Sequence, residues 1–187
     1  MSDKNFWAII DASISEDQSK QATTLAADLS QLNKDQLIAF ESSYRSKLEA
    51  AYRWDLWAAA YIINGGCSDD GFDYFCDWLI SRGQEVFNTA LENPESLIGI
   101  ATPWDTEFEE FRYVMMDVMS DKHKSEFPMP TKARPMSLAG EEWDEETVGN
   151  KYPKLAAWVE NNISVTPTQS RTLTPKVSFW KRLFGKT

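Results

Sequence analysis

The fold is decided by a central run that is apolar nearly all round, Tyr52-Arg53-Trp54-Asp55-Leu56-Trp57-Ala58-Ala59-Ala60-Tyr61-Ile62-Ile63. A helix without a polar face has to be enclosed by other elements. Eight of the 24 aromatic residues fall between Tyr52 and Trp78, so this part of the chain is also the most aromatic. We therefore predict a buried central helix. It ends at Asn64-Gly65-Gly66, because glycine adopts the left-handed conformation that caps a helix.

Amphipathic helices are predicted ahead of this run. A first short helix begins behind Ser2 or Asp3, and Ser15 to Gln18 fits a capping box for the next helix. A second capping box, Asn33 to Gln36, opens an apolar stripe that continues from Leu37 to Ala51.

Further helices are predicted behind the run. Ser68 caps a helix that ends at Arg82-Gly83, and a short helix follows over 84–91. Thr102-Pro103 predicts the start of the last long helix, because proline suits the first helical position. Prolines interrupt residues 127–136, and a final short helix covers 153–160. With no convincing strand, the sequence predicts an all-α fold, a single compact multi-helix domain over residues 1–162.

The composition changes at Ile163. Residues 163–187 are rich in Ser and Thr and hold five basic residues but no acidic residue. The 162 residues before them hold 14 basic and 29 acidic residues, a formal net charge of −15. This polarity predicts a flexible Ser/Thr/Pro linker that tethers a basic, aromatic tail to an acidic body.

Charge and hydropathy exclude several functional classes. The net charge of −10 argues against nucleic-acid binding, because a phosphate backbone would be repelled. With Tyr counted as apolar, the longest run without a polar side chain is Leu56 to Ile63, which has eight residues, whereas a membrane-spanning helix needs roughly 20. The first residues do not resemble a signal peptide, and two cysteines do not make a disulfide framework. We therefore expect a cytoplasmic protein without a transmembrane segment.

The sharpest chemical pattern is the spacing of Asp69, Asp70 and Asp73. It places carboxylates on one helix face, where Mg²⁺ can be held together with a diphosphate. No second acidic motif accompanies it, and acids in a first helical turn also pair with exposed backbone N–H groups. The capping interpretation is therefore favoured, and we expect no metal and no cofactor.

Two other residues invite a catalytic interpretation. Cys67 precedes a predicted helix N-terminus, where a thiolate is most easily stabilised, but His123, the only histidine, does not suit the role of its base. Asp55 lies between tryptophans, which favours a buried hydrogen-bonding role over that of a general acid, and Arg53 is expected to point elsewhere.

Several blocks form longer motifs. They are Phe6-Trp7-x-x-Ile10-Asp11, Tyr52-Arg53-Trp54-Asp55-Leu56-Trp57-x-Ala59-Ala60-Tyr61, Asn64-Gly65-Gly66-Cys67-Ser68-Asp69-Asp70-Gly71-Phe72-Asp73-Tyr74-Phe75, Trp78-Leu79-Ile80-x-Arg82-Gly83, Gly140-Glu141-Glu142-Trp143-Asp144 and Tyr152-Pro153-x-Leu155. Over roughly residues 3 to 160, these blocks resemble the bacterial domain-of-unknown-function family 4240. The resemblance implies a cytoplasmic helical domain in bacteria and carries over no established reaction.

Acidic clusters at 105–110 and 141–146 favour a protein-binding function, because they can steer the chain onto a basic surface. We expect an inhibitory binding protein and not an enzyme, most concretely a bacterial immunity protein that neutralises a cognate toxin. Its partner would be another protein, such as a basic toxin domain. The expected partner-binding residues are Glu107, Glu109, Glu110, Glu141, Glu142, Asp144, Glu145, Glu146, Phe179, Trp180, Leu183 and Phe184.

The alternative function is that of a small-ligand receptor or a metal-dependent enzyme. It would use an aromatic pocket with a polar rim. The residues of that pocket would be Trp54, Asp55, Trp57, Asn64, Asp69, Asp70 and Asp73.

The tail has an amphipathic pattern of its own. Phe179, Trp180, Leu183 and Phe184 fall at i, i+1, i+4 and i+5, so a helix would gather them on one side and leave the basic residues on the other. We expect the tail to pack on its own acidic domain or in a groove of a partner. Weak contact with a membrane surface is the alternative, and the charge of the body opposes it.

Overall fold

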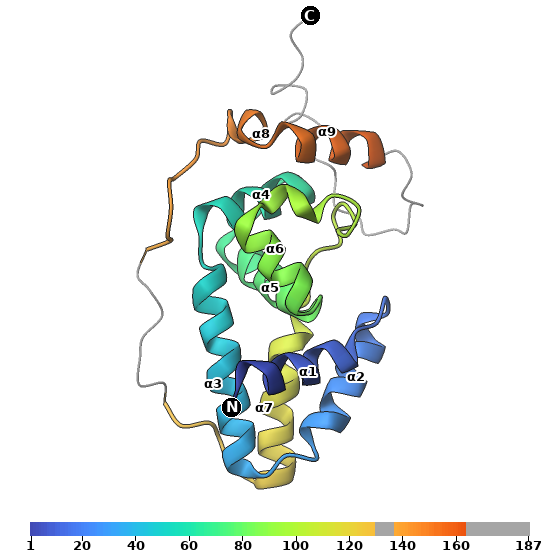
Figure 1. Cartoon of the computed structure of the whole chain (residues 1–187), viewed down its shortest axis with the longest axis vertical. Helices are drawn as coiled ribbons and strands as arrows, with labels where there is room; N and C mark the ends of the chain where they lie inside the picture. Colours follow the sequence, from blue (N-terminus) through green and yellow to red (C-terminus); the bar gives the residue numbers. More distant parts are fainter. Residues whose placement is uncertain (130–136, 164–187) are drawn as a thin grey trace, which may run out of the picture.

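The structure, a computed structural model, describes residues 1–129 and 137–163 (Figure 1). The predicted all-α fold is confirmed, since the described residues form helices and no strand beyond one isolated bridge between Arg53 and Ala139. The elements are α1 (Asp3–Ser13), α2 (Gln18–Leu29), α3 (Lys34–Ala51), α4 (Trp54–Asn64), α5 (Asp69–Ser81), α6 (Gln84–Glu92), the 3-10 helix η1 (Pro94–Leu97), α7 (Glu110–His123), α8 (Val148–Lys151) and α9 (Pro153–Asn162).

The helices form two halves along the long axis of the molecule. Figure 1 shows α1, α2, α3 and α7 in one half, α4, α5 and α6 in the other, and α8 and α9 lying across the far end. The halves share one core, because α5 packs against α1, α3 and α7 as well as against α4 and α6. One cluster of buried side chains runs from Phe6 in α1 to Val159 in α9.

The predicted central helix is confirmed as α4. Its residues from Ala58 to Ile63 are all buried, and it packs against α5, α8, α9 and η1. The helix ends at Gly65, whose φ of 65° is the predicted left-handed cap. It is separate from α3, because the backbone of Tyr52 and Trp54 exchanges hydrogen bonds with Ala139, and the chain between the two helices is therefore extended.

Most of the predicted helix starts are confirmed, and two are wrong. The side chains of Ser2, Asn33 and Ser68 cap their helices, and the Asn33 box is complete. The second helix, however, is capped by Asp17, whose carboxylate accepts from Lys20 N–H at 3.1 Å. A charged acceptor makes the stronger cap, and the Ser15 hydroxyl instead accepts from Asp17 N–H.

The second error is the start of the last long helix. Thr102-Pro103 does not begin a helix, and α7 starts only at Glu110. Between them the chain forms a loop, because its backbone and side chains hydrogen-bond to other helices and not to one another along a helix. Pro103, which was expected at the first position of a helix, instead lies in a turn that the Asp105 N–H closes on the Thr102 carbonyl.

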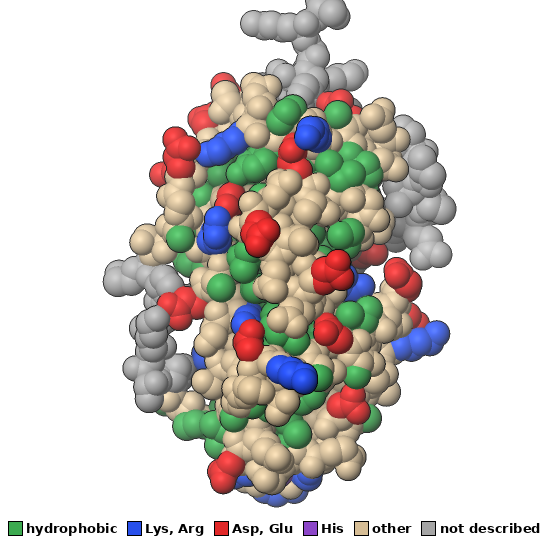
Figure 2. Space-filling model, in the orientation of Figure 1, with side chains coloured by type: hydrophobic (Ala, Val, Ile, Leu, Met, Phe, Trp, Pro, Cys, Tyr) green, Lys and Arg blue, Asp and Glu red, His purple; other side chains and the backbone are tan. Residues whose placement is uncertain are grey.

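Among residues 1–129 and 137–163, none of the helices combines the length and the hydrophobicity that spanning a bilayer requires. Both cysteines are free thiols, with Cys76 buried and Cys67 half-buried. Figure 2 shows acidic side chains spread among basic ones over one face of the molecule. The predicted tail residues Phe179, Trp180, Leu183 and Phe184 lie outside the described residues.

Gly83 provides a test of the packing between α1 and α6. Its φ is +90°, and a Cβ at this position would lie 2.5 Å from Oδ1 of Asp11. That carboxylate accepts from Gln84 N–H at 3.1 Å and so satisfies the first turn of α6. We expect Gly83→Ala to lower the free energy of unfolding by about 2 kcal/mol, from backbone strain and the displaced cap together.

The matched control for this measurement is Gly66→Ala. Gly66 also has a positive φ, +134°, but a Cβ there would meet no atom within 4 Å. Urea unfolding should therefore show a smaller loss than for Gly83→Ala. Equal losses would mean that backbone strain alone accounts for both and that the Asp11 contact contributes nothing.

Candidate functional site

Residues 102–109 form a loop between η1 and α7 that is fixed to three helices. The N–H of Trp104 donates to the carbonyl of Ile63 in α4 at 3.2 Å, and the N–H of Phe108 donates to Tyr74 in α5 at 3.1 Å. The carbonyl of Glu107 accepts from the Gln18 amide of α2 at 3.0 Å. Thr106 is fully buried and donates its hydroxyl proton to the Asn64 side chain at 2.8 Å. The loop is therefore held in one position.

Trp104 occupies an unusual place in this loop. The N–H of Asp105 donates to the carbonyl of Thr102 at 3.0 Å, which closes a turn with Pro103 and Trp104 at its centre. Trp104 has a φ of +63°, as the third residue of a type II turn does, where glycine is normally found. Such a backbone costs a non-glycine residue about 1 kcal/mol or more.

The strained residue is also exposed. The Trp104 side chain keeps 50% of its surface accessible, although tryptophan is usually well covered in a folded protein. A bulky residue that is strained in its backbone and uncovered in its side chain contributes little to folding. Strain of this kind is concentrated at functional sites, so Trp104 marks the loop as a candidate site.

Acidic residues follow Trp104 in the loop and at the start of α7. Asp105, Glu107, Glu109 and Glu110 are all exposed. Glu109 accepts a hydrogen bond from the Tyr74 hydroxyl at 3.1 Å, and this bond raises the pKa of Tyr74. The predicted residues of the first acidic cluster are therefore exposed, on the fixed loop that carries Trp104 and at the start of α7.

The second acidic segment, 141–146, is held by an aromatic anchor. The indole N–H of Trp143 donates to the carbonyl of Trp54 at 2.7 Å, and its ring lies edge-on to the rings of Trp54 and Trp57. Glu145 accepts from the Tyr61 hydroxyl at 3.1 Å. Its neighbours in the segment are exposed, namely Glu141, Glu142, Asp144 and Glu146.

The structure brings the two acidic segments to the same helix. The first docks on Asn64 and Ile63 and the second on Tyr61, all in the last turn of α4. Residues three apart on a helix lie side by side, about 5–6 Å apart between their Cβ atoms. The two segments, which are separated by more than 30 residues of sequence, therefore both attach to the last turn of α4.

The residues of the alternative pocket are not gathered in this way. Asp55 forms a two-point ion pair with Arg53, at 2.9 and 2.6 Å, so the expectation that Arg53 points elsewhere is wrong. Both side chains lie at the start of α4, where Asp55 also accepts from Leu56 N–H. Trp54 and Trp57 stack with their ring centres 5.5 Å apart.

The three aspartates of α5 have different surroundings. Asp69 and Asp70 are exposed in the first turn, whereas Asp73 faces Arg112 of α7 at 3.7 Å. Asn64 is used by the 102–109 loop. Within residues 1–129 and 137–163, no three His, Cys, Asp or Glu side chains come together in a way that could hold a metal ion.

The thiol of Cys67 is not activated. Burial raises its pKa to about 12, and the nearby carboxylate of Glu107 adds to the shift. The thiol therefore stays protonated at neutral pH, although it lies just ahead of the α5 N-terminus. Its backbone carbonyl accepts from the Trp57 indole at 3.2 Å, so this residue is part of the packing between α4 and α5.

A buried polar cluster between α3, α5 and α7 was not predicted from the sequence. Asp77 of α5 is fully buried, and its carboxylate accepts hydrogen bonds from the Tyr44 hydroxyl and the Arg112 guanidinium. Burial raises the pKa of Asp77 to about 6, and Arg112 and Tyr44 limit that rise. Burial lowers the pKa of Arg112, but Asp77 outweighs this effect and raises it.

The cluster gives the stability of the protein a pH dependence. The folded state holds the Asp77 proton more tightly than the unfolded state, whose value is near 3.8, so the free energy of unfolding falls as pH rises from 3.8 to about 6. We expect Arg112→Met to remove about 3 kcal/mol of stability at pH 7, because it leaves a buried carboxylate without its cation. The loss should shrink at pH 5, where Asp77 takes up a proton.

Urea unfolding at both pH values measures this effect. The matched control is Lys151→Met, which breaks the exposed pair with Glu141, 3.0 Å apart, and should cost about 1 kcal/mol or less. A loss for Arg112→Met that stays the same at pH 5 and pH 7 would contradict the role given to Asp77.

A model of the family described as "Protein of unknown function (DUF4240)" matches residues 1–121. The chain belongs to this family. The part that matches DUF4240 includes the central helix, the 102–109 loop and the Tyr44–Asp77–Arg112 cluster, whereas Trp143 and the second acidic segment lie beyond it. No curated protein and no solved structure matches the chain.

Trp104 is the site residue that the sequence pattern did not predict. Its signal was present, because Thr102-Pro103-Trp104-Asp105 has proline at the second position of a possible turn. The same proline also suits the start of a helix, and the apolar spacing from Phe108 onward favoured that interpretation. Only the hydrogen bonds of the loop to α4 and α5 distinguish a turn at Pro103 from the start of a helix.

Proposed function

We propose that this DUF4240 protein binds and inhibits another protein, and that it does so without enzymatic activity of its own. In its most specific form, the proposal is that the chain is a bacterial immunity protein that neutralises a cognate toxin. The observation that carries the proposal is Trp104, an exposed and strained tryptophan on a fixed loop among acidic residues.

Trp104 has the properties of a binding anchor. A few residues carry most of the energy of a protein interface, and tryptophan is prominent among them. A loop that is already fixed loses little conformational entropy when it binds, so more of its contact energy remains as affinity. The hydrogen bonds of the loop to α2, α4 and α5 supply this preorganisation.

The acidic residues define the chemistry of the partner. The exposed carboxylates of the loop and of segment 141–146 lie on a body with a formal net charge of −15. Such a surface accelerates association with a basic partner and suppresses acidic ones. Toxins that act on nucleic acids or nucleotides often have basic clefts, and such a cleft would suit both the charge and the aromatic anchor.

The first test measures binding of a partner. The full chain is used to capture proteins from its native host, a captured protein is identified by mass spectrometry, and its affinity is then measured with the purified pair. We expect Trp104→Gly to weaken that affinity about 30-fold, as the loss of an interface anchor worth about 2 kcal/mol. Raising the salt concentration should slow association, because the steering is electrostatic.

Two controls separate binding from folding. Glycine adopts a positive φ without steric strain, so Trp104→Gly should unfold at the same urea concentration as the natural protein or at a higher one. Met116→Ala removes another large exposed side chain, 52% accessible, from a different surface and should bind normally. Unchanged affinity for Trp104→Gly would contradict the proposed site.

The second test addresses the inhibitory role. Expression of the protein should rescue cells from the product of the neighbouring gene, and Trp104→Gly should rescue them less well at equal protein level. A protein that is recovered alone from its host, and that rescues no cells, would not be an immunity protein.

A further inference from the structure

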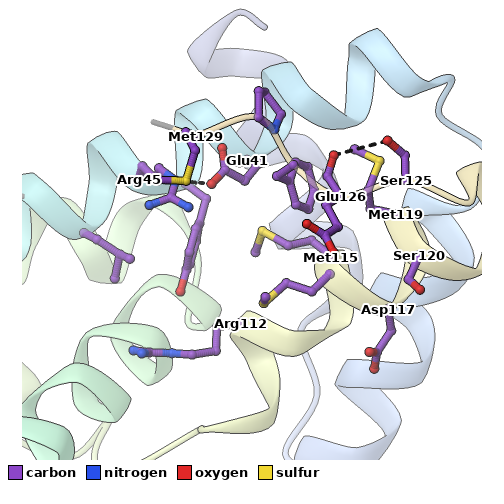
Figure 3. Close-up of a pocket in the computed structure, with 15 residues that line it drawn as sticks. Glu41, Arg45, Arg112, Met115, Asp117, Met119, Ser120, Ser125, Glu126 and Met129 are labelled. Atoms are coloured by element: carbon purple, nitrogen blue, oxygen red, sulfur yellow. Dashed lines mark hydrogen bonds and ion pairs between the residues drawn. The ribbon is translucent and has the colours of Figure 1, made fainter. Parts of the chain in front are cut away.

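A cavity of about 580 Å³ lies between α3 and α7 and is bordered by residues 125–129 (Figure 3). Figure 3 shows Glu41 and Arg45 of α3 on one side and Met115 of α7 on the other. Tyr44 and Arg112, from the buried cluster, form part of its wall. None of the residues of the 102–109 loop lines it, so this groove is separate from the proposed partner site.

The groove is lined by methionines. Four of the six methionines of the chain contribute to it, namely Met115, Met116, Met119 and Met129. Met116 and Met129 keep 52% and 89% of their surface accessible. Methionine side chains are flexible and polarisable, and they are frequent where a protein binds apolar segments of varying shape. The groove is therefore suited to an apolar peptide.

The charges around the groove favour a basic occupant. Its two arginines already have acidic partners, since Arg45 pairs with Glu41 and Arg112 with Asp77. The acidic groups Asp117 and Glu126 form no ion pair with a described residue. The surplus charge of the lining is thus negative.

We propose that the C-terminal segment of the same chain, residues 177–186, docks in this groove. The segment is Val177-Ser178-Phe179-Trp180-Lys181-Arg182-Leu183-Phe184-Gly185-Lys186, and it lies outside the described residues. Its four large apolar residues at helical spacing match the methionine lining, and its three basic residues match the surplus acids. An amphipathic helix in an apolar groove is a common mode of peptide recognition.

The chain between the described body and the C-terminal segment is long enough for the segment to reach the groove. Fifteen residues separate Ile163 from Phe179, and they can span about 50 Å when extended. A body of this size has a radius of gyration of about 15 Å and hence a diameter of roughly 40 Å. A tether of this length gives the segment an effective concentration of about 1 mM, so a weak intrinsic affinity is enough for docking.

Methyl NMR of the full chain, labelled at its methionines, tests the proposal directly. The signals of Met115, Met116, Met119 and Met129 should shift in the double variant Trp180→Ala/Phe184→Ala, because aromatic rings leave their surroundings. The signal of Met1, which does not line the groove, should stay in place. The control variant Ser178→Ala, in the same segment, should reproduce the natural spectrum. Unchanged groove signals in the double variant would overturn the proposal.

Competition by a synthetic peptide of residues 175–187 tests whether the segment binds its own chain. The peptide should restore the natural groove signals of the double variant, and it should bind the natural protein about tenfold more weakly, because the tethered segment competes for the groove. Equal binding to both proteins would overturn the proposal.

Two other occupants would give different results. Groove signals that shift with protein concentration, together with a dimer in sedimentation, would mean that the segment binds a second copy. Groove signals that do not respond to the tail variant, with binding of the natural protein to anionic vesicles lost in that variant, would assign the tail to a membrane surface. Either result would overturn docking within one chain. Neither depends on Trp104, so a failure here leaves the proposed function intact.

Discussion

The structure depends on the burial of α4, a helix that has no polar face. Its residues from Ala58 to Ile63 are all buried, so the helix is stable only inside a shell of other elements. α5, α8, α9 and η1 provide that shell. The requirement reaches far along the chain, since Trp143 covers the aromatic side of the helix and Ala139 binds the backbone at its start. The helix is thereby a scaffold on which distant segments meet.

The segments that meet on α4 carry the candidate site. The last turn of the helix anchors the loop of Trp104 through Ile63 and Asn64, and it anchors Glu145 through Tyr61. A loop attached to a rigid scaffold can hold a strained residue, because the hydrogen bonds around it outweigh a local cost of about 1 kcal/mol. The burial that stabilises the fold therefore also positions an exposed tryptophan among acidic groups.

A buried charge joins the two halves of the molecule. Asp77 receives hydrogen bonds from α3 and α7, and these bonds fix the two helices relative to α5. Burying a carboxylate is costly, and Tyr44 and Arg112 offset that cost only in this geometry. Beyond the cluster the two helices are bridged by flexible methionines, which leave a groove open between them. Tyr44 and Arg112 thus belong both to the polar cluster and to the wall of the groove.

The sequence by itself determined the helical class, the buried central helix and its glycine end, because hydrophobic periodicity and capping depend on neighbouring residues. Asn33 and Ser68 were found in this way. It also located the acidic segments, but it did not show that they share a helix. Tertiary structure decided the rest. Only contacts between distant residues turned Thr102-Pro103 into a strained turn, directed Arg53 to Asp55, and joined Tyr44, Asp77 and Arg112, which lie on three helices. Such pairings are set by packing, and no local pattern records them.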